Sequence, residues 1–303
     1  MGGAESKPLS PPSRPSPPSP PPSPPKPPPE YAAPWRTTPW EDREHLKKTL
    51  MEFQLSNPNV KYVRILVIGD VGAGKSSFIN SVNSAFQERI TTEALADNAA
   101  APIARSFTKI YRTFNIRSGQ SVLPFVFNDI MGLEAGESGA QPDDIVKALK
   151  GLLKEGYKFN PANPVSDGDE GFRCDPEVHE QTFCLVYIMA ADSVSRKNPE
   201  VIKKMVDIRK KASELDIPQV IIMTRVDEIC PLVKGNVRKI YTSKKIKTKM
   251  EECSILIGVP MSHIFPVKNY HEEIDTASDI DVLLLRALTQ IVQIANDKLR
   301  NVQ

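Results

Sequence analysis

The sequence contains a glycine-rich stretch, Gly69-Asp70-Val71-Gly72-Ala73-Gly74-Lys75-Ser76, that fits the pattern G-x-x-x-x-G-K-[ST]. The apolar, β-branched run at residues 63–68 comes directly before it and predicts a buried strand. Apolar residues at helical spacing follow it, among them Phe78 and Val82. A strand, a glycine loop and a helix in this order predict a phosphate-binding P-loop, because backbone N–H groups and the positive end of the helix would surround phosphate oxygens.

Each polar residue of this loop has an expected role. Lys75 would reach the β- and γ-phosphates, and the Ser76 hydroxyl would ligate Mg²⁺. The glycines allow the backbone to approach the phosphates closely. We therefore expect the nucleotide to contact a set of residues from the loop and the start of its helix, namely Gly69, Val71, Gly72, Ala73, Gly74, Lys75, Ser76 and Ser77.

A second phosphate-side motif lies downstream. Asp129-Ile130-Met131-Gly132 fits D-x-x-G and follows an apolar run at residues 123–128. In this motif the aspartate holds Mg²⁺, usually through water, and the glycine N–H meets the γ-phosphate. The short pattern is informative here because of its distance from the P-loop strand, and it predicts metal binding by Asp129.

Two stretches bear on the base of the nucleotide. Thr224-Arg225-Val226-Asp227 resembles the [NT]-K-x-D signature, in which the Asp227 carboxylate would accept from the ring N–H and the exocyclic amine of guanine. Adenine offers neither donor in that geometry and would leave a buried carboxylate unpaired. We therefore expect GTP or GDP as the ligand, and an ATP-using P-loop enzyme is the disfavoured alternative.

Arg225 and the last predicted strand complete the base site. Arginine replaces the usual lysine, whose stem lies across the base, and a guanidinium can also stack on a ring although the two side chains are not interchangeable. Residues 263–267 predict the last strand, and Lys268 and Asn269 fall in the polar loop after it. GTPases place backbone N–H groups near the guanine oxygen in this loop.

The residue that senses the γ-phosphate should lie between the P-loop helix and the next strand. Thr91, Thr92, Ser106 and Thr108 are the candidates for a second Mg²⁺-binding hydroxyl. Thr108 is favoured because it lies just before the strand predicted at residues 110–116.

The sequence leaves enzymatic activity open. After D-x-x-G many GTPases carry a glutamine that orients the attacking water, and here that residue is Leu133. Leucine cannot orient water, so we expect slow hydrolysis or a residue supplied by a partner or by self-association. The alternative is an interaction scaffold that binds nucleotide without turning it over.

Composition narrows the class of protein. The 303 residues carry a formal net charge of +2, which implies no bulk attraction to nucleic acid. The four cysteines show no C-x-x-C spacing and follow no secretory signal, so we expect reduced thiols and a cytoplasmic location. No apolar run reaches the roughly 18 residues of a membrane span.

The N-terminal residues 1–34 are predicted to form a disordered tail. Met1-Gly2-Gly3-Ala4-Glu5-Ser6 fits the N-myristoylation pattern M-G-x-x-x-[ST], with Gly2 as the acylated residue. One myristoyl chain gives only marginal membrane binding, so we expect transient membrane contact. More than half of the 28 prolines lie in residues 8–34 and predict a polyproline II spacer. Residues 14–20 and 21–26 match the two orientations of SH3-domain ligands and make SH3-domain proteins candidate partners. Such matches are frequent in any proline-rich run, so a plain spacer is the favoured interpretation.

Residues 35–303 are expected to form a G domain with a leading and a C-terminal helix. Thr38-Pro39-Trp40-Glu41 and Ser278-Asp279-Ile280-Asp281 look like capping boxes, Asn198-Pro199 opens a further helix, and a lysine-rich helix is predicted at residues 239–256. Strands 110–116 and 123–129 form a hairpin. The order predicts an α/β, Ras-like P-loop NTPase fold, with a mostly parallel sheet, one antiparallel strand and helices on both faces.

The combination of motifs resembles the interferon-induced protein 44 family over roughly residues 34–300. The resemblance is carried by Pro34-Trp35-Arg36, by residues 64–69 and 71–78, by Tyr111-Arg112-Thr113, by residues 157–161 and by Val226-Asp227. It implies a cytosolic GTP-binding protein that is induced in the antiviral innate immune response. The acylation pattern and the proline-rich tail depart from that family.

Overall fold

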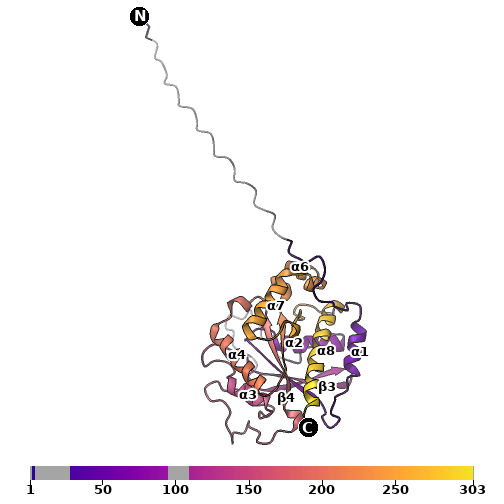
Figure 1. Ribbon diagram of the computed structural model, residues 1–303, viewed down its shortest axis with the longest axis vertical. Coiled ribbons are helices and arrows are strands. Elements are labelled where there is room, and N and C mark those ends of the chain that lie inside the picture. Colours follow the sequence, from indigo (N-terminus) through magenta and orange to yellow (C-terminus); the bar gives the residue numbers. More distant parts are fainter. Residues whose placement is uncertain (1, 4–27, 95–108, 303) are drawn as a thin grey trace.

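A six-stranded sheet forms the centre of the molecule (Figure 1). The computed structural model describes residues 2–3, 28–94 and 109–302. The strand order is β2-β3-β1-β4-β5-β6, and only the neighbours β2 and β3 run antiparallel. The strands are β1 (Val63–Gly69), β2 (Arg112–Ser118), β3 (Ser121–Asp129), β4 (Thr182–Ala190), β5 (Gln219–Thr224) and β6 (Ile264–Pro266). The predicted fold class is confirmed. The predicted hairpin is also present, with its strands extended to Ser118 and from Ser121, so that the turn is shorter than the gap between the predicted strands.

Helices cover both faces of this sheet. The α-helices are α1 (Arg43–Met51), α2 (Lys75–Gln87), α3 (Pro142–Leu149), α4 (Pro199–Glu214), α5 (Val226–Ile229), α6 (Pro231–Gly235), α7 (Lys244–Ile257) and α8 (Ser278–Arg300). Short 3₁₀ turns are η1 (Val178–Glu180), η2 (Val194–Arg196), η3 (Val237–Tyr241) and η4 (Met261–His263). One apolar cluster joins α1, α2 and α8 to the sheet, and a second joins α3, α4 and α7 to the opposite face.

The central strand shows why both faces must be covered. Every residue of β1 is buried. Because side chains alternate along a strand, Ile65 and Val67 belong to the cluster under α2 and α8, whereas Leu66 and Ile68 belong to the cluster under α3, α4 and α7. A continuous apolar run is the pattern of a parallel strand buried on both faces, as the sequence predicted.

Several helix boundaries differ from the prediction. The Asn198 side chain accepts from the Glu200 N–H and caps α4 as expected. The two predicted capping boxes are wrong: α1 begins at Arg43 and α8 follows Ala277, and neither has a side-chain cap. The lysine-rich helix begins at Lys244 rather than at residue 239, since the Ser243 side chain caps it and a 3₁₀ turn precedes it. Helix α3, with proline in its first turn, was not predicted.

The N-terminal segment joins the folded body earlier than the boundary expected at residue 35. The Lys244 N–H donates to the Pro29 carbonyl, and the Tyr31 N–H donates to the Thr242 carbonyl at 2.8 Å. The Arg36 guanidinium donates to the carbonyls of Met261 and Ile264 beside β6. Residues 28–36 are therefore attached to η3, α7 and the edge strand.

Some predicted features fall outside this description. Thr108, Ser106 and the two SH3-ligand matches lie outside the described residues. Gly2 is described and exposed. Cys174 is exposed, the other three cysteines are buried, and all four are free thiols. Among the described residues, no helix combines the length and apolarity that a membrane crossing requires.

A buried acid ties the first helix to the last. The Asp281 side chain is fully buried and accepts from Arg43 Nε at 2.8 Å and from the Tyr270 hydroxyl at 2.6 Å. Removal of this carboxylate would leave Arg43 Nε without its partner and would take the shorter of two acceptors from the Tyr270 hydroxyl.

We predict that Asp281→Ala lowers the free energy of unfolding by about 3 kcal/mol or more, because it removes one partner of a buried ion pair. Asp279→Ala is the matched control in the same first helical turn, where a partly exposed pair with Arg238 contributes less than about 1 kcal/mol. Urea unfolding measures both. Equal losses in the two variants would contradict this account.

Candidate nucleotide-binding site

The predicted motifs meet at one edge of the sheet. The glycine loop follows β1, the Asp129 motif ends β3, the Asp227 motif follows β5, and Lys268 and Asn269 follow β6. These four strands run parallel to one another, so their carboxyl ends lie along the same edge. In open α/β sheets ligands bind at this edge, where the strand order reverses around the first strand.

Side chains from the ends of β5 and β6 hold the glycine loop by donating hydrogen bonds to its carbonyl groups. The Thr224 hydroxyl donates to the Ala73 carbonyl at 2.7 Å, Arg225 Nη2 donates to the Gly72 carbonyl at 2.6 Å, and Asn269 Nδ2 donates to the Gly74 carbonyl at 3.2 Å. Because C=O and N–H point in opposite directions across a trans peptide, these donors direct the loop's N–H groups toward the other side. The result is a concave row of backbone donors of the kind that binds anions.

Close packing explains why glycine is needed at one position in the loop and at one position in the Asp129 motif beside it. Gly74 has φ +93°, and a Cβ there would lie 3.0 Å from the Asn269 amide. At Gly132, an added Cβ would lie 2.7 Å from the Val71 side chain. Larger residues at these two positions would push the loop away from β5 and from the Asp129 motif.

The predicted phosphate and metal residues lie together. Ser76 and Asp129 are both buried, and the Ser76 hydroxyl donates to Asp129 Oδ2 at 2.6 Å. Hydroxyl and carboxylate oxygens are the ligands that Mg²⁺ takes from proteins, usually one or two per site. The Lys75 ammonium donates to the carbonyls of Gly69 at 3.5 Å and Asp70 at 3.1 Å. These residues fit a nucleotide phosphate with its metal ion. Within the described ranges, no group of three or more His, Cys, Asp or Glu side chains could hold a metal by itself.

Leu133 lies in the core. Its side chain is 1% exposed and belongs to the apolar cluster under α3 and α4, while its N–H donates to the Gly69 carbonyl at 2.9 Å. The residue that in many GTPases orients water is therefore unsuited here both by its chemistry and by its burial.

At the base end, the structure corrects the strand boundary. Strand β5 ends at Thr224, and Asp227 lies on the short helix α5 rather than at the end of the strand. Arg225, in the left-handed region at φ 55°, makes the turn between them. Its guanidinium donates to the Gly72 carbonyl and lies 3.5 Å from Asp192. The guanidinium is therefore engaged by the glycine loop and by Asp192, and it is not free to stack on a nucleotide base.

Lys268 lies between two acids near this end. Its Nζ is 3.8 Å from Asp227 Oδ2 and 2.7 Å from Glu273 Oε1. Although burial opposes it, the His271 N–H and the Lys268 ammonium hold the pKa of Glu273 at about 2. Lys268 is thus held chiefly by Glu273. The Asn269 Oδ1 atom is buried and has no hydrogen-bond partner among the described residues.

The sequence did not reveal the ion pair between Asp70 and the buried Lys197. The Lys197 side chain is 1% exposed, and its ammonium binds the Asp70 carboxylate. Asp70 occupies a variable position of the glycine-loop pattern, and Lys197 lies just before α4, far along the chain. No local spacing links two such residues.

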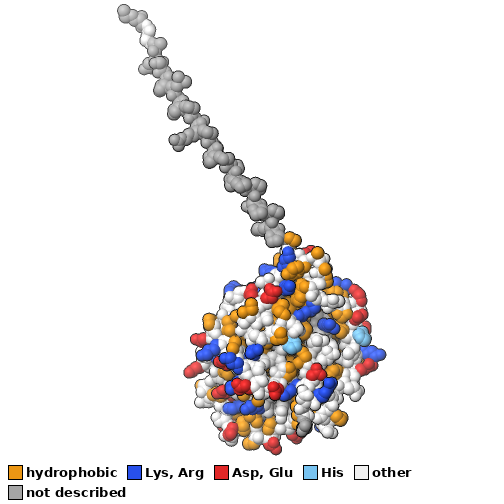
Figure 2. Space-filling model, viewed as in Figure 1, with side chains coloured by type: hydrophobic (Ala, Val, Ile, Leu, Met, Phe, Trp, Pro, Cys, Tyr) orange, Lys and Arg blue, Asp and Glu red, His pale blue; other side chains and the backbone are white. Residues whose placement is uncertain are grey.

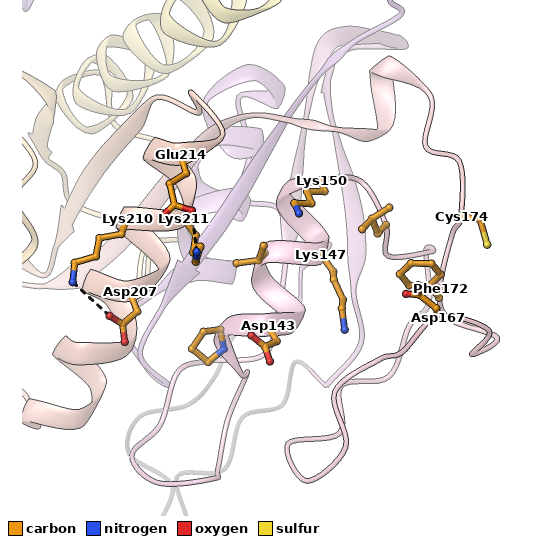
Figure 3. Close-up of a pocket in the computed structure, with 13 residues that line it drawn as sticks. Asp143, Lys147, Lys150, Asp167, Phe172, Cys174, Asp207, Lys210, Lys211 and Glu214 are labelled. Atoms are coloured by element: carbon orange, nitrogen blue, oxygen red, sulfur yellow. Dashed lines mark hydrogen bonds and ion pairs between the residues drawn. The ribbon is translucent and has the colours of Figure 1, made fainter.

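A separate hollow of about 930 Å³ lies between α3, α4 and the loop that carries Phe172 (Figure 3). Four lysines and four acids line it: Lys147, Lys150, Lys210, Lys211, Asp143, Asp167, Asp207 and Glu214. Its charges balance and none of the predicted nucleotide residues lines it, so it does not fit an anionic nucleotide.

Sequence comparison gives curated relatives. No family model matches the chain. Interferon-induced protein 44 of Homo sapiens is 32% identical over 263 residues, and the Mus musculus protein of that name is 30% identical over 260 residues. The interferon-induced protein 44-like protein of Homo sapiens is 29% identical over 265 residues. The chain is homologous to the interferon-induced protein 44 family.

The shared region covers only part of each protein. The match to the human protein covers 86% of this chain but 58% of the relative, so the chain spans less than two thirds of the relative's length.

Matches to solved structures are more distant. A probable GTP-binding protein EngB is 15% identical with a TM-score of 0.41, over 78% of this chain and all of that one. Era of Aquifex aeolicus, bound to GDP·AlF₄⁻, is 14% identical with a TM-score of 0.37, over 69% of this chain and 51% of that one.

We predict that Thr224→Val lowers the free energy of unfolding by about 1–2 kcal/mol, because it leaves the Ala73 carbonyl without its buried donor while conserving side-chain volume. Urea unfolding is the measurement. Thr248→Val, at an exposed position of α7, is the matched control and should change stability by less than about 0.5 kcal/mol. Equal effects at the two positions would show that the loop does not depend on this bond.

Proposed function

We propose that this chain binds a guanine nucleotide together with Mg²⁺ at the edge of the sheet formed by the carboxyl ends of β1, β3, β5 and β6. The observation that carries the proposal is the convergence of Lys75, Ser76 and Asp129 at one end of the glycine loop with Asp227 at the other. A phosphate cradle and a carboxylate for the base would thus lie at the same edge of the sheet.

At the phosphate end, the chain supplies donors and metal ligands. The N–H groups of the glycine loop and the start of α2 would bind the phosphates, and Lys75 would exchange its two backbone carbonyl partners for phosphate oxygens. Ser76 and Asp129 would hold the metal ion. When bound, Mg²⁺ neutralises charge on the β- and γ-phosphates.

At the base end, Asp227 would accept from the two donors of guanine. Its side chain is 23% exposed and Lys268 stays 3.8 Å away, so the carboxylate remains accessible. Glu273 would support selectivity by holding the Lys268 ammonium at 2.7 Å and limiting its competition for Asp227. Arg225 would place its stem beside the base while its guanidinium holds the Gly72 carbonyl.

Hydrolysis would be slow in the isolated chain. Leu133 is buried and cannot position water, and Val71 packs against Gly132 at the same point. Turnover would require a residue from a partner or from a second copy of this chain. The second candidate function, a scaffold that binds nucleotide without significant hydrolysis, is favoured by the same burial of Leu133.

The cellular role extends this proposal. We propose that the chain acts as a nucleotide switch in the cytoplasm, within the interferon-induced antiviral response. The relatives named interferon-induced protein 44 support the link to interferon. Those relatives are longer than this chain, so their further regions lie outside the proposed role.

We predict that the purified protein binds fluorescent GTP and GDP, and that ATP competes poorly. Asp227→Ala should weaken GTP binding about hundredfold or more, because two hydrogen bonds to a charged acceptor are lost. Titration with and without Mg²⁺ measures this effect.

Two controls complete the titration. Glu228→Ala removes the neighbouring, more exposed acid of the same helix and should leave affinity nearly unchanged. Lys75→Ala should weaken the binding of every nucleotide. Equal affinity for GTP and ATP would refute the assignment of Asp227.

We predict that Leu133→Gln does not accelerate phosphate release, because position 133 lies in the apolar core, and that it lowers the free energy of unfolding by about 3 kcal/mol. Single-turnover release of phosphate and urea unfolding test the two statements. Leu133→Met is the volume-matched control and should cost less than about 1.5 kcal/mol. Faster release from the glutamine variant would contradict the placement of this residue.

A further inference from the structure

One segment of the chain concentrates positive charge. Residues 229–250 contain seven lysines and arginines and no acid, although the whole chain carries a net charge of only +2. This segment forms α6, η3 and the first half of α7. Figure 2 shows basic and hydrophobic side chains together at this end of the molecule.

Most of these charges are not neutralised. Arg238 pairs with Glu41 and Asp279, Lys239 pairs with Glu30, and Lys249 pairs with Glu252. Within the part of the chain that the structure describes, the remaining basic residues of the segment make no ion pair: Lys234, Lys244, Lys245 and Lys247. Three of them, Lys244, Lys245 and Lys247, lie within the first turn of α7, and we call these three residues the basic face.

An aromatic ring lies against the basic face. The ammonium groups of Lys244 and Lys247 lie 5.4 and 5.3 Å from the centre of the Tyr31 ring, and Tyr31 is 37% exposed. Cation–π contact holds the two lysines around a ring that still faces solvent. Aromatic rings with an apolar body and a polar tip, flanked by lysine, suit the boundary between water and lipid headgroups.

The N-terminal tail leaves the folded body at this same face. The Lys244 N–H donates to the Pro29 carbonyl at 3.1 Å, and the Glu30 carboxylate binds Lys239 at 2.9 Å. The segment that carries the acylation pattern at Gly2 is therefore rooted beside Lys244. A single acyl chain binds membranes only marginally, and a basic patch is the kind of second signal that makes such binding stable.

We propose that the basic face docks on anionic lipid headgroups and acts together with an acyl chain on Gly2. A lipid surface is favoured over nucleic acid because the segment that carries the acylation pattern joins the folded body next to the basic face. The proposal is independent of the nucleotide site, since none of the lysines of the basic face lies among the residues assigned to GTP.

The test uses the full-length acylated protein and sedimentation with two kinds of vesicle. One kind is phosphatidylcholine alone, and the other contains about a third phosphatidylserine. Lys244→Gln/Lys245→Gln/Lys247→Gln should weaken binding to the acidic vesicles by up to about a hundredfold, because each basic residue near an anionic surface contributes about a fivefold factor. Raising the salt concentration should weaken the wild type more than this variant.

The matched control is Lys203→Gln/Lys210→Gln/Lys211→Gln, which removes the same charge from exposed positions of α4. It should bind acidic vesicles as the wild type does, and both triple variants should retain circular dichroism and GTP binding. Gly2→Ala should lose binding to both vesicle types. Equal losses in the two triple variants would overturn the proposal, as would a wild type that prefers a short RNA and ignores acidic vesicles.

Discussion

The arrangement of the candidate site depends on how the glycine loop is held. A loop that offers its N–H groups to an anion must have its carbonyl groups satisfied elsewhere, because buried backbone acceptors are costly to leave unpaired. Here the donors come from the ends of β5 and β6, through Thr224, Arg225 and Asn269. The shape of the phosphate cradle is thus set by the strands that also carry the base-side residues.

This constraint links the two ends of the site. Thr224 is the last residue of β5, and Asp227 follows it after a single turn at Arg225. The bond from Thr224 to the Ala73 carbonyl therefore fixes the distance between the loop and the carboxylate assigned to guanine. Parallel pairing of β1 with β4 and of β4 with β5 keeps this distance through the sheet itself.

The sequence was most informative where a requirement is local. The strand, glycine loop and helix at residues 63–87 were predicted because periodicity and the glycine spacing lie within one stretch. Contacts between distant residues were missed: the pair of Lys197 and Asp70, and the hold of Glu273 on Lys268, depend on tertiary packing. The predicted capping box at Ser278 failed for a related reason, because Asp281 bonds to Arg43 and Tyr270 rather than to its own backbone.

The geometry around β6 also bears on how the basic face relates to the nucleotide site. Arg36, at the root of the tail, donates to the Ile264 carbonyl, and its guanidinium lies 5.2–5.5 Å from the rings of Trp35, Tyr241 and Phe265. Strand β6 then leads directly to Lys268 and Asn269. Because Phe265 and Tyr241 are buried, the root of the tail and the base end of the site are packed against one rigid strand. The root of the tail and the base end of the site are therefore connected through β6, which pairs in parallel with β5.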